Sequence, residues 1–173
     1  MPSKEVDSYR YLDHLTKRLV RSWIKREDQV HPPPAIPWKP LSKPLQEATV
    51  ALVSSAGLAL KTDVPFDQAG EKRNPWWGDP SFRSLPRGAT GKDVRLYHLH
   101  VNSSLATQDL DTFFPLRRLA ELEEGGDIGR SADHHYSYMG YILEPEVLLS
   151  ETVPAMVQHM ERDGVDAVVL VPV

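Results

Sequence analysis

The sequence predicts an α/β protein in which helices cover a Rossmann-like parallel sheet, preceded by an N-terminal helix and a proline-rich strap. Apolar runs that suit strands alternate along the chain with stretches of helical periodicity. The last run, residues 165–173, is apolar without alternation, which is typical of a parallel strand buried on both faces. We therefore expect two parts, an extension at 1–47 and an α/β domain at 48–173.

Composition limits the classes of function. With 173 residues, 40% hydrophobic and 25% charged, the chain suits one soluble domain with a core. A net charge of -4 without a basic cluster argues against binding to nucleic acid or an anionic membrane. No apolar run spans a bilayer and the polar start lacks a signal peptide's apolar segment, so we expect a cytoplasmic protein. The absence of Cys excludes disulfides, thiolate catalysis and Cys-based metal sites from these residues.

An amphipathic helix is expected at residues 4–26. Its apolar side chains recur at helical spacing: Leu12, Leu15, Leu19 and Trp23. The prolines of HPPPAIPWKPLSKP follow and remove amide donors, so the helix has to end near Val30. Two interpretations of this strap stay open: a spacer that fixes the helix against the main body, or a motif that binds an aromatic groove of a partner.

The main domain is expected to begin with a β-branched, apolar strand at 49–53. A second strand is predicted at 93–102, where apolar and polar residues alternate. Helices are predicted at 114–124, closed by two glycines, and at 151–162, directly before the terminal strand.

The first strand ends in residues that suit an anion-binding loop. Ligands gather beyond the carboxyl ends of the strands in open parallel sheets. There, Ser54, Ser55 and Gly57 would turn hydroxyls and backbone amides toward a carboxylate or phosphate. The alternative is an ordinary tight turn.

Two histidines end the predicted second strand. His98 and His100 share one face, a spacing that lets two imidazoles reach one metal ion. Further ligands would have to come from elsewhere: His134, His135, and Asp133 or Asp79. Because no recognised metal motif such as HExxH is present, we expect no metal site, and hydrogen bonding is the simpler role for these histidines.

The segment DHHYSYMG is expected to be a functional loop. His134, His135 and Tyr136 combine imidazoles, which titrate near neutrality, with a phenol, and such groups serve in general acid–base catalysis. The alternative is a surface loop anchored in the core by Tyr136, Tyr138 and Met139.

A second candidate loop, NPWWGDPSFRSLP, combines aromatic and charged residues. Trp76 and Trp77 would form an aromatic wall, with Asp79 beside it and the Arg83 guanidinium binding a carboxylate. Packing of both tryptophans against the proline-rich strap is the simpler alternative.

Five segments occur in the order found in one known family: ALVSSAGL followed by PFD, GDPSFRSLP, DLDTFFPLRRLAELEEGGDIG and HHYSYMGYI. They resemble the selenoprotein B family of glycine, sarcosine, betaine and D-proline reductases. The resemblance covers about residues 48–173 and leaves 1–47 outside it. It implies that 48–173 are the N-terminal part of a reductase-like α/β domain whose sheet is incomplete.

The resemblance implies an oxidoreductase subunit whose selenocysteine comes just after a strand similar to DAVVLVPV. That position would follow Val173 directly, so we expect a UGA codon there, a longer natural chain, and 173 residues that are inactive alone. The selenolate would reductively cleave a C–N bond of a small amino acid or amine activated by a pyruvoyl group on a partner subunit, with no cofactor in this chain.

The same chemistry suggests roles for the candidate residues. The groups that would protonate the leaving nitrogen are His134, His135 and Tyr136. The groups that would hold the substrate carboxylate are Ser54, Ser55 and Gly57, and the rest of the substrate-binding set is Asp79, Arg83, His98 and His100.

Two other functions stay open. One is a noncatalytic binding or assembly subunit that uses the sheet edge and the strap, and the other is a metal-dependent hydrolase built on the histidines. An uncovered terminal strand would expose apolar surface at about 25 cal/mol per Å². We therefore expect the isolated chain to dimerise or aggregate through it.

Overall fold

The computed structural model describes residues 13–30, 39–74, 77–98, 101–102, 104 and 108–173. The chain divides into two compact units, Met1–Pro40 and Leu41–Val173. In the first unit, helix α1 (His14–Val30) begins where the Asp13 carboxylate accepts the N–H groups of Leu15 and Thr16, each at 3.0 Å. The described part of α1 reaches Val30, near which the helix is predicted to end, and its predicted first residues, 4–12, and the residues after Val30, 31–38, lie outside the described ranges. The domain boundary predicted after residue 47 stays a prediction.

The main sheet of the second unit has five strands: β1 (Thr49–Ser54), β3 (Phe82–Pro86), β5 (Arg130–Ser131), β6 (His134–Tyr138) and β7 (Ala167–Val171). β7 pairs in parallel with one edge of β1, from Val50 to Ser54. β5 and β6 are also parallel to β1 and pair with its other edge, β5 at the start of β1 and β6 at its end. β3 runs antiparallel to β6. The sheet is therefore mixed, and the prediction of an all-parallel sheet is wrong because the segment between β1 and the next parallel strand contributes a reversed strand.

The predicted first and last strands are confirmed by β1 and β7, but the predicted second strand is not part of the main sheet. Only Val94–Leu96 form a strand there, β4, which pairs antiparallel with β2 (Leu58–Leu60) in a separate two-stranded sheet. Alternation of side chains indicates a strand but carries no information on which neighbour it pairs with. Leu99 and His100 lie outside the described residues.

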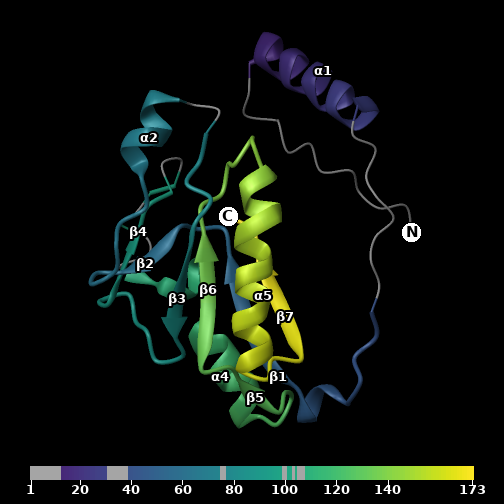
Figure 1. The fold of residues 1–173 in the computed structure, drawn as a ribbon, viewed down its shortest axis with the longest axis vertical. Coiled ribbons are helices and arrows are strands. Elements are labelled where there is room, and N and C mark those ends of the chain that lie inside the picture. Colours follow the sequence, from purple (N-terminus) through teal and green to yellow (C-terminus); the bar gives the residue numbers. More distant parts are fainter. Residues whose placement is uncertain (1–12, 31–38, 75–76, 99–100, 103, 105–107) are drawn as a thin grey trace. The chain divides into compact units, whose positions relative to one another are not determined.

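Both predicted helices of the main domain are confirmed. The helical elements whose bounds the structure describes in the second unit are η1 (Leu45–Glu47), α2 (Gln68–Arg73), η2 (Leu110–Thr112), α4 (Leu116–Glu124), the π-helical turn η3 (Leu148–Thr152) and α5 (Val153–Arg162). α5 lies along β6 and β7 (Figure 1) and packs Met156 and Met160 against Val53. α4 packs Leu119 on the other face, in the cluster that contains Leu52. Within the described ranges, no helix is long and apolar enough to cross a membrane.

β7 is fixed at its start and exposed along its length. The Asp166 carboxylate accepts the Thr49 N–H at 2.8 Å and pairs with Lys43 at 2.9 Å, which ties the start of β7 to β1. The exposed fractions of the three central side chains are large: Val168 40%, Val169 46% and Leu170 72%. In the described part of the chain, β7 pairs with β1 along one edge, and no strand pairs with the other edge of β7. A Rossmann-like continuation of the sheet stays a prediction.

Candidate functional site

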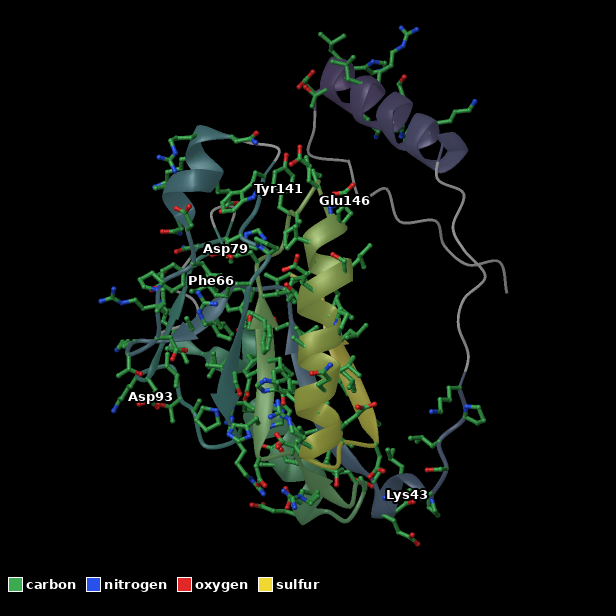
Figure 2. The ribbon with its side chains drawn as sticks, viewed as in Figure 1. Lys43, Phe66, Asp79, Asp93, Tyr141 and Glu146 are labelled. Carbon is green, nitrogen blue, oxygen red and sulfur yellow. The ribbon has the colours of Figure 1, made fainter. Side chains whose placement is uncertain are left out.

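The carboxyl ends of β1, β6 and β7 meet at one edge of the sheet. The register pairs Ser54 of β1 with both Ser137 of β6 and Val171 of β7, so the residues that follow these strands leave from the same side. In Figure 2, Tyr141 and Asp79 lie toward this end of β6, whereas Lys43 and Asp93 lie toward the opposite end. We call this region the carboxyl edge; it comprises Ser54–Gly57, Ser137–Gly140 and Val171–Val173. Ligands of α/β sheets gather at such an edge.

The hydroxyls of Ser54 and Ser137 are fully buried and bonded to backbone. Ser54 Oγ donates to the Phe113 carbonyl at 2.8 Å. Ser137 Oγ donates to the Ser54 carbonyl at 3.0 Å and accepts the Leu58 N–H at 2.9 Å. These bonds satisfy backbone groups where β1 turns into β2, and they occupy the Ser54 hydroxyl that the sequence assigns to an anion.

Ser55 joins β1 to the end of β7. Its N–H donates to the Val171 carbonyl at 3.2 Å, and its Oγ accepts the Val173 N–H at 2.9 Å. The first bond extends the ladder by one residue, and the second holds the chain beyond β7, where Pro172 has no amide of its own to donate. The backbone at Val173 is therefore held against the end of β1.

Gly57 makes the turn between β1 and β2 possible. Its φ of +63° lies in the left-handed region, and a β-carbon there would come within 2.3 Å of Met139 Sδ. Its N–H donates to the Tyr138 carbonyl at 2.8 Å, and its carbonyl accepts the Tyr97 N–H at 2.9 Å. Gly57 thus links β6 to the residues that lead into His98.

The His98 side chain is 8% exposed and reaches the carboxyl edge. A methyl group built on Gly140 would lie 2.8 Å from His98 Nε2 and 2.9 Å from the Ser55 carbonyl oxygen. The imidazole and the end of β1 therefore pack closely against Gly140, which is possible because residue 140 has no side chain. His100 lies outside the described residues, and its role stays a prediction.

Sequence reasoning missed Gly140 and Tyr141, which follow Met139 just beyond the end of β6. Tyr141 has a φ of +60° and is 50% exposed. A bulky side chain in the left-handed region costs about 1–3 kcal/mol and is held there by its surroundings. Glycine after Met139 was a visible signal of close packing, whereas the Tyr141 backbone conformation has no signature in the sequence.

Asp79 and Arg83 organise the loops beside β3. Asp79 accepts the Asp67 N–H at 2.8 Å and the Ser81 N–H at 2.9 Å. The Arg83 guanidinium lies 4.2 Å above the Phe66 ring, and its Nε donates to the Val64 carbonyl at 2.9 Å. Figure 2 shows Phe66 and Asp79 in this region. Trp76 lies outside the described residues, so the predicted aromatic wall stays a prediction.

DHHYSYMG is not the predicted loop: His134–Tyr138 form strand β6, between β1 and β3. His135 is fully buried, its Nδ1 accepts the Leu52 N–H at 3.0 Å, and its Nε2 lies 3.1 Å from Ser131 Oγ. Burial lowers the pKa of His135 to about 4. The ring is therefore neutral, with its proton on Nε2, and it bonds the sheet internally.

His134 and Tyr136 converge on Asp163 after α5. His134 Nδ1 lies 3.0 Å from Asp163 Oδ2, and the Tyr136 hydroxyl donates to the same oxygen at 3.4 Å. Burial, together with the Asp163 charge, raises the pKa of Tyr136 to about 12. Because His134 is the first residue of β6, this cluster lies at the amino end of the strand.

The structure thus divides the predicted site residues into three groups. Ser55, Gly57 and His98 lie together at the carboxyl edge, with Ser54 buried beside them. Asp79 and Arg83 belong to the adjoining loops. The third group, at the other end of β6 or inside the sheet, is His134, His135 and Tyr136. Among the described residues, no group of three or more His, Asp or Glu side chains is arranged to hold a metal ion.

Comparison with known proteins gives one family and two curated relatives. The profile of glycine/sarcosine/betaine reductase selenoprotein B matches residues 1–173. The D-proline reductase subunit gamma of Acetoanaerobium sticklandii is 32% identical over 141 residues, which are 82% of this chain and 54% of that protein. The glycine reductase complex component B subunit gamma of Carboxydothermus hydrogenoformans is 29% identical over 143 residues, 83% of this chain and 31% of that protein.

The chain therefore spans about half the length of the first relative and about a third of the second. No solved structure matches it.

Proposed function

This chain belongs to the glycine/sarcosine/betaine reductase selenoprotein B family, and on that premise we propose that it is part of a reductase subunit that cleaves a C–N bond of a small amino acid or amine. The names of both curated relatives describe subunits of such reductases, one for D-proline and one for glycine. Their greater length leaves room for a reactive residue outside the 173 residues.

The observation that carries this proposal is the bond from the Val173 N–H to Ser55 Oγ, at 2.9 Å. It holds the backbone beyond β7 against Ser55, whose carbonyl lies beside His98 and Gly140, at the edge where the parallel strands of an α/β sheet gather ligands. A selenocysteine after Val173 would supply a selenolate, an anionic nucleophile at neutral pH. The residues present fit it, since the glycine at 140 lets an imidazole pack against the end of β1.

The chain's own residues are proposed to bind and orient the substrate around that position. Ser54, Ser55 and Gly57 stay our predicted carboxylate-binding set, supported by their place at the carboxyl edge, but the two hydroxyls already bond to backbone. Backbone amides, rather than these hydroxyls, are therefore the donors that we expect to contact a carboxylate. Asp79, Arg83, His98 and His100 complete the predicted substrate-binding set.

His134, His135 and Tyr136 stay predicted proton donors to the leaving nitrogen. The geometry gives them less support than it gives His98. His135 is buried with its Nε2 proton directed at Ser131, and His134 lies at the amino end of β6 beside Asp163. Of the histidines described, His98 is the one that borders the carboxyl edge, so we place proton transfer there first.

The reaction class sets what partners must supply. Reductive cleavage of one C–N bond consumes two electrons and two protons: the carbon gains the electron pair and a proton, and the nitrogen leaves as an amine. A two-electron reductant is therefore required, and we propose a dithiol, which gives up two electrons and two protons as it becomes a disulfide. We further propose that a partner subunit carries a pyruvoyl group that activates the substrate amine, and that the complex works in the cytoplasm.

Two measurements test the proposed function. We expect the codon after Val173 to be an in-frame UGA followed by an open frame, and the full-length protein to contain selenium by mass spectrometry. The full-length protein with its partner subunits should reduce glycine, D-proline, sarcosine or betaine with a dithiol. A different codon, or a selenium-containing complex inert toward all four, would overturn the proposal.

An assembly role is the second candidate, because β7 exposes apolar side chains on both faces. It predicts that a full-length variant without selenium still forms the complex and that the complex has an unrelated activity. Loss of reductive cleavage on replacing selenocysteine with serine, with the complex intact, would decide for the reductase.

A further inference from the structure

We propose that Ser55, His98 and Gly140 form the seat of the reactive residue: Ser55 positions its backbone, Gly140 lets the His98 imidazole pack against the end of β1, and that imidazole faces its anion. This inference rests on the proposed function and assigns separate roles to three residues within it. It also changes the role of Ser55, which the sequence suggests is an anion ligand.

Ser55 is a positioning residue because it bonds to the last residue of β7 and to the segment that follows it. The Ser55 N–H bonds to the Val171 carbonyl at 3.2 Å, and Oγ accepts from the Val173 N–H at 2.9 Å. Ser55 is 9% exposed, so water competes little for this hydroxyl. Together the two bonds fix the direction in which the chain leaves Val173.

Gly140 determines how close His98 comes to the end of β1. A β-carbon on Gly140 would sit 2.8 Å from His98 Nε2, 3.1 Å from His98 Cδ2 and 2.9 Å from the Ser55 carbonyl. Real β-carbons do not approach other atoms so closely, and the carbonyl is backbone that cannot rotate away. Any side chain at residue 140 would therefore push His98 from the end of β1.

His98 supplies what an anion at this position needs. An imidazole beside a thiolate or selenolate stabilises the anion by hydrogen bonding and, when protonated, by charge. The backbone around His98 is fixed by the Tyr97 N–H bonded to the Gly57 carbonyl at 2.9 Å. The left-handed glycine at 57 thus holds both the β1 turn and the approach to His98.

The test uses full-length protein in two forms, one with selenocysteine and one with cysteine in its place. In the cysteine form, ionisation limits reaction with iodoacetamide, so the alkylation rate at pH 7 reports anion stabilisation. The variants are S55A, S55T, H98Q and G140A. The matched control is G88A, because a β-carbon on Gly88 would meet no atom within 4 Å. Thermal melting checks that each variant is folded, and peptide mass spectrometry locates the alkylated residue.

We expect H98Q and G140A to slow alkylation about tenfold, equivalent to about one pKa unit of the thiol, while G88A reacts as the parent does. We expect S55A to raise amide hydrogen exchange at Val173 about tenfold, the loss of one buried hydrogen bond, and S55T to restore protection. In the selenocysteine form within the complex, S55A should lower kcat more than it raises KM.

Each result bears on the proposal. Parental alkylation rates in folded H98Q and G140A overturn the roles of His98 and Gly140, and unchanged Val173 exchange in S55A overturns the role of Ser55. If these variants behave as expected but the complex reduces none of the four substrates, the seat stands and the proposed function fails. If the complex is active and the variants match the parent, the seat fails and the function stands.

Discussion

β1 and β7 are neighbouring parallel strands of similar composition, TVALVS and AVVLV, with opposite environments. Val50, Ala51, Leu52 and Val53 of β1 are at most 6% exposed, whereas their register partners on β7 include Leu170 at 72%. β1 has strands on both edges, α4 on one face and α5 on the other. β7 has a strand on one edge. The comparison shows that neighbours, and not the apolar content of a strand, decide how much of it is buried.

The largest expected difference between the strands is the cost of removing one leucine side chain. Leu52→Ala should lower the free energy of unfolding by about 4 kcal/mol, because Leu52 is 1% exposed and the surrounding core cannot collapse into the cavity. Leu170→Ala should cost less than about 0.5 kcal/mol. Urea denaturation of both variants measures this, and equal losses would show that β7 is covered after all.

Two neighbouring histidines of β6, His134 and His135, allow the effect of burial on stability to be measured through its pH dependence. His135 is fully buried and its pKa is lowered from 6.5 to about 4. Between these values the unfolded chain binds the proton and the folded chain does not, so stability is full above pH 6.5 and falls toward pH 4. The loss should reach about 3 kcal/mol.

Urea melts at pH 7 and pH 4 in His135→Gln and His134→Gln variants measure this contribution. We expect His135→Gln to remove most of the pH dependence and His134→Gln, an exposed site, to leave most of it in place. The prediction is wrong if the His135→Gln slope equals that of the parent.

Self-association of the chain tests whether the exposed strand, β7, binds other chains. We expect the isolated 173-residue chain to dimerise or aggregate through β7, because an uncovered apolar edge strand recruits other chains. Leu170→Lys should weaken this association about tenfold or more, about 1.4 kcal/mol. Val64→Lys is the control, at a site 77% exposed and outside the strands. Sedimentation velocity decides, and a monodisperse parent monomer would contradict the prediction.

The smallest expected effect concerns the start of β7. Asp166→Ala removes the acceptor of the Thr49 N–H and should cost about 1 kcal/mol, since that amide is left without its bond. Lys43→Met removes the other half of the ion pair and should cost less than about 0.5 kcal/mol, because the Lys43 side chain is 38% exposed. Thermal melting of the two variants ranks them, and the reverse order would refute the assignment.

The parts of the fold that could be predicted are those whose signal is local. The apolar runs of β1 and β7 and the stripes of α4 and α5 identify these elements within a few residues of their observed ends. β6 could not be predicted, because HHYSY has a polar composition that suits a loop. It is a strand because His135 and Ser137 find backbone partners in β1 and in the turn to β2.

The candidate site, like the fold, was predicted only where its signal is local. The expectation that small and polar residues follow β1 at a ligand-binding edge led to Ser55 and Gly57, and the alternation of the second predicted strand led to His98. Gly140 and Tyr141 were missed, since their importance comes from contacts and backbone geometry that depend on distant residues.

By itself, the sequence determined where β1, β7, α4 and α5 lie and which residue types are available for chemistry, because periodicity, glycine and proline act through local backbone preferences. Only the tertiary structure decided that β3 is reversed, that β4 leaves the main sheet, and that His98 borders the carboxyl edge whereas His134 lies at the opposite end of β6. These outcomes depend on hydrogen bonds and packing between residues far apart in the chain, which local preferences do not encode.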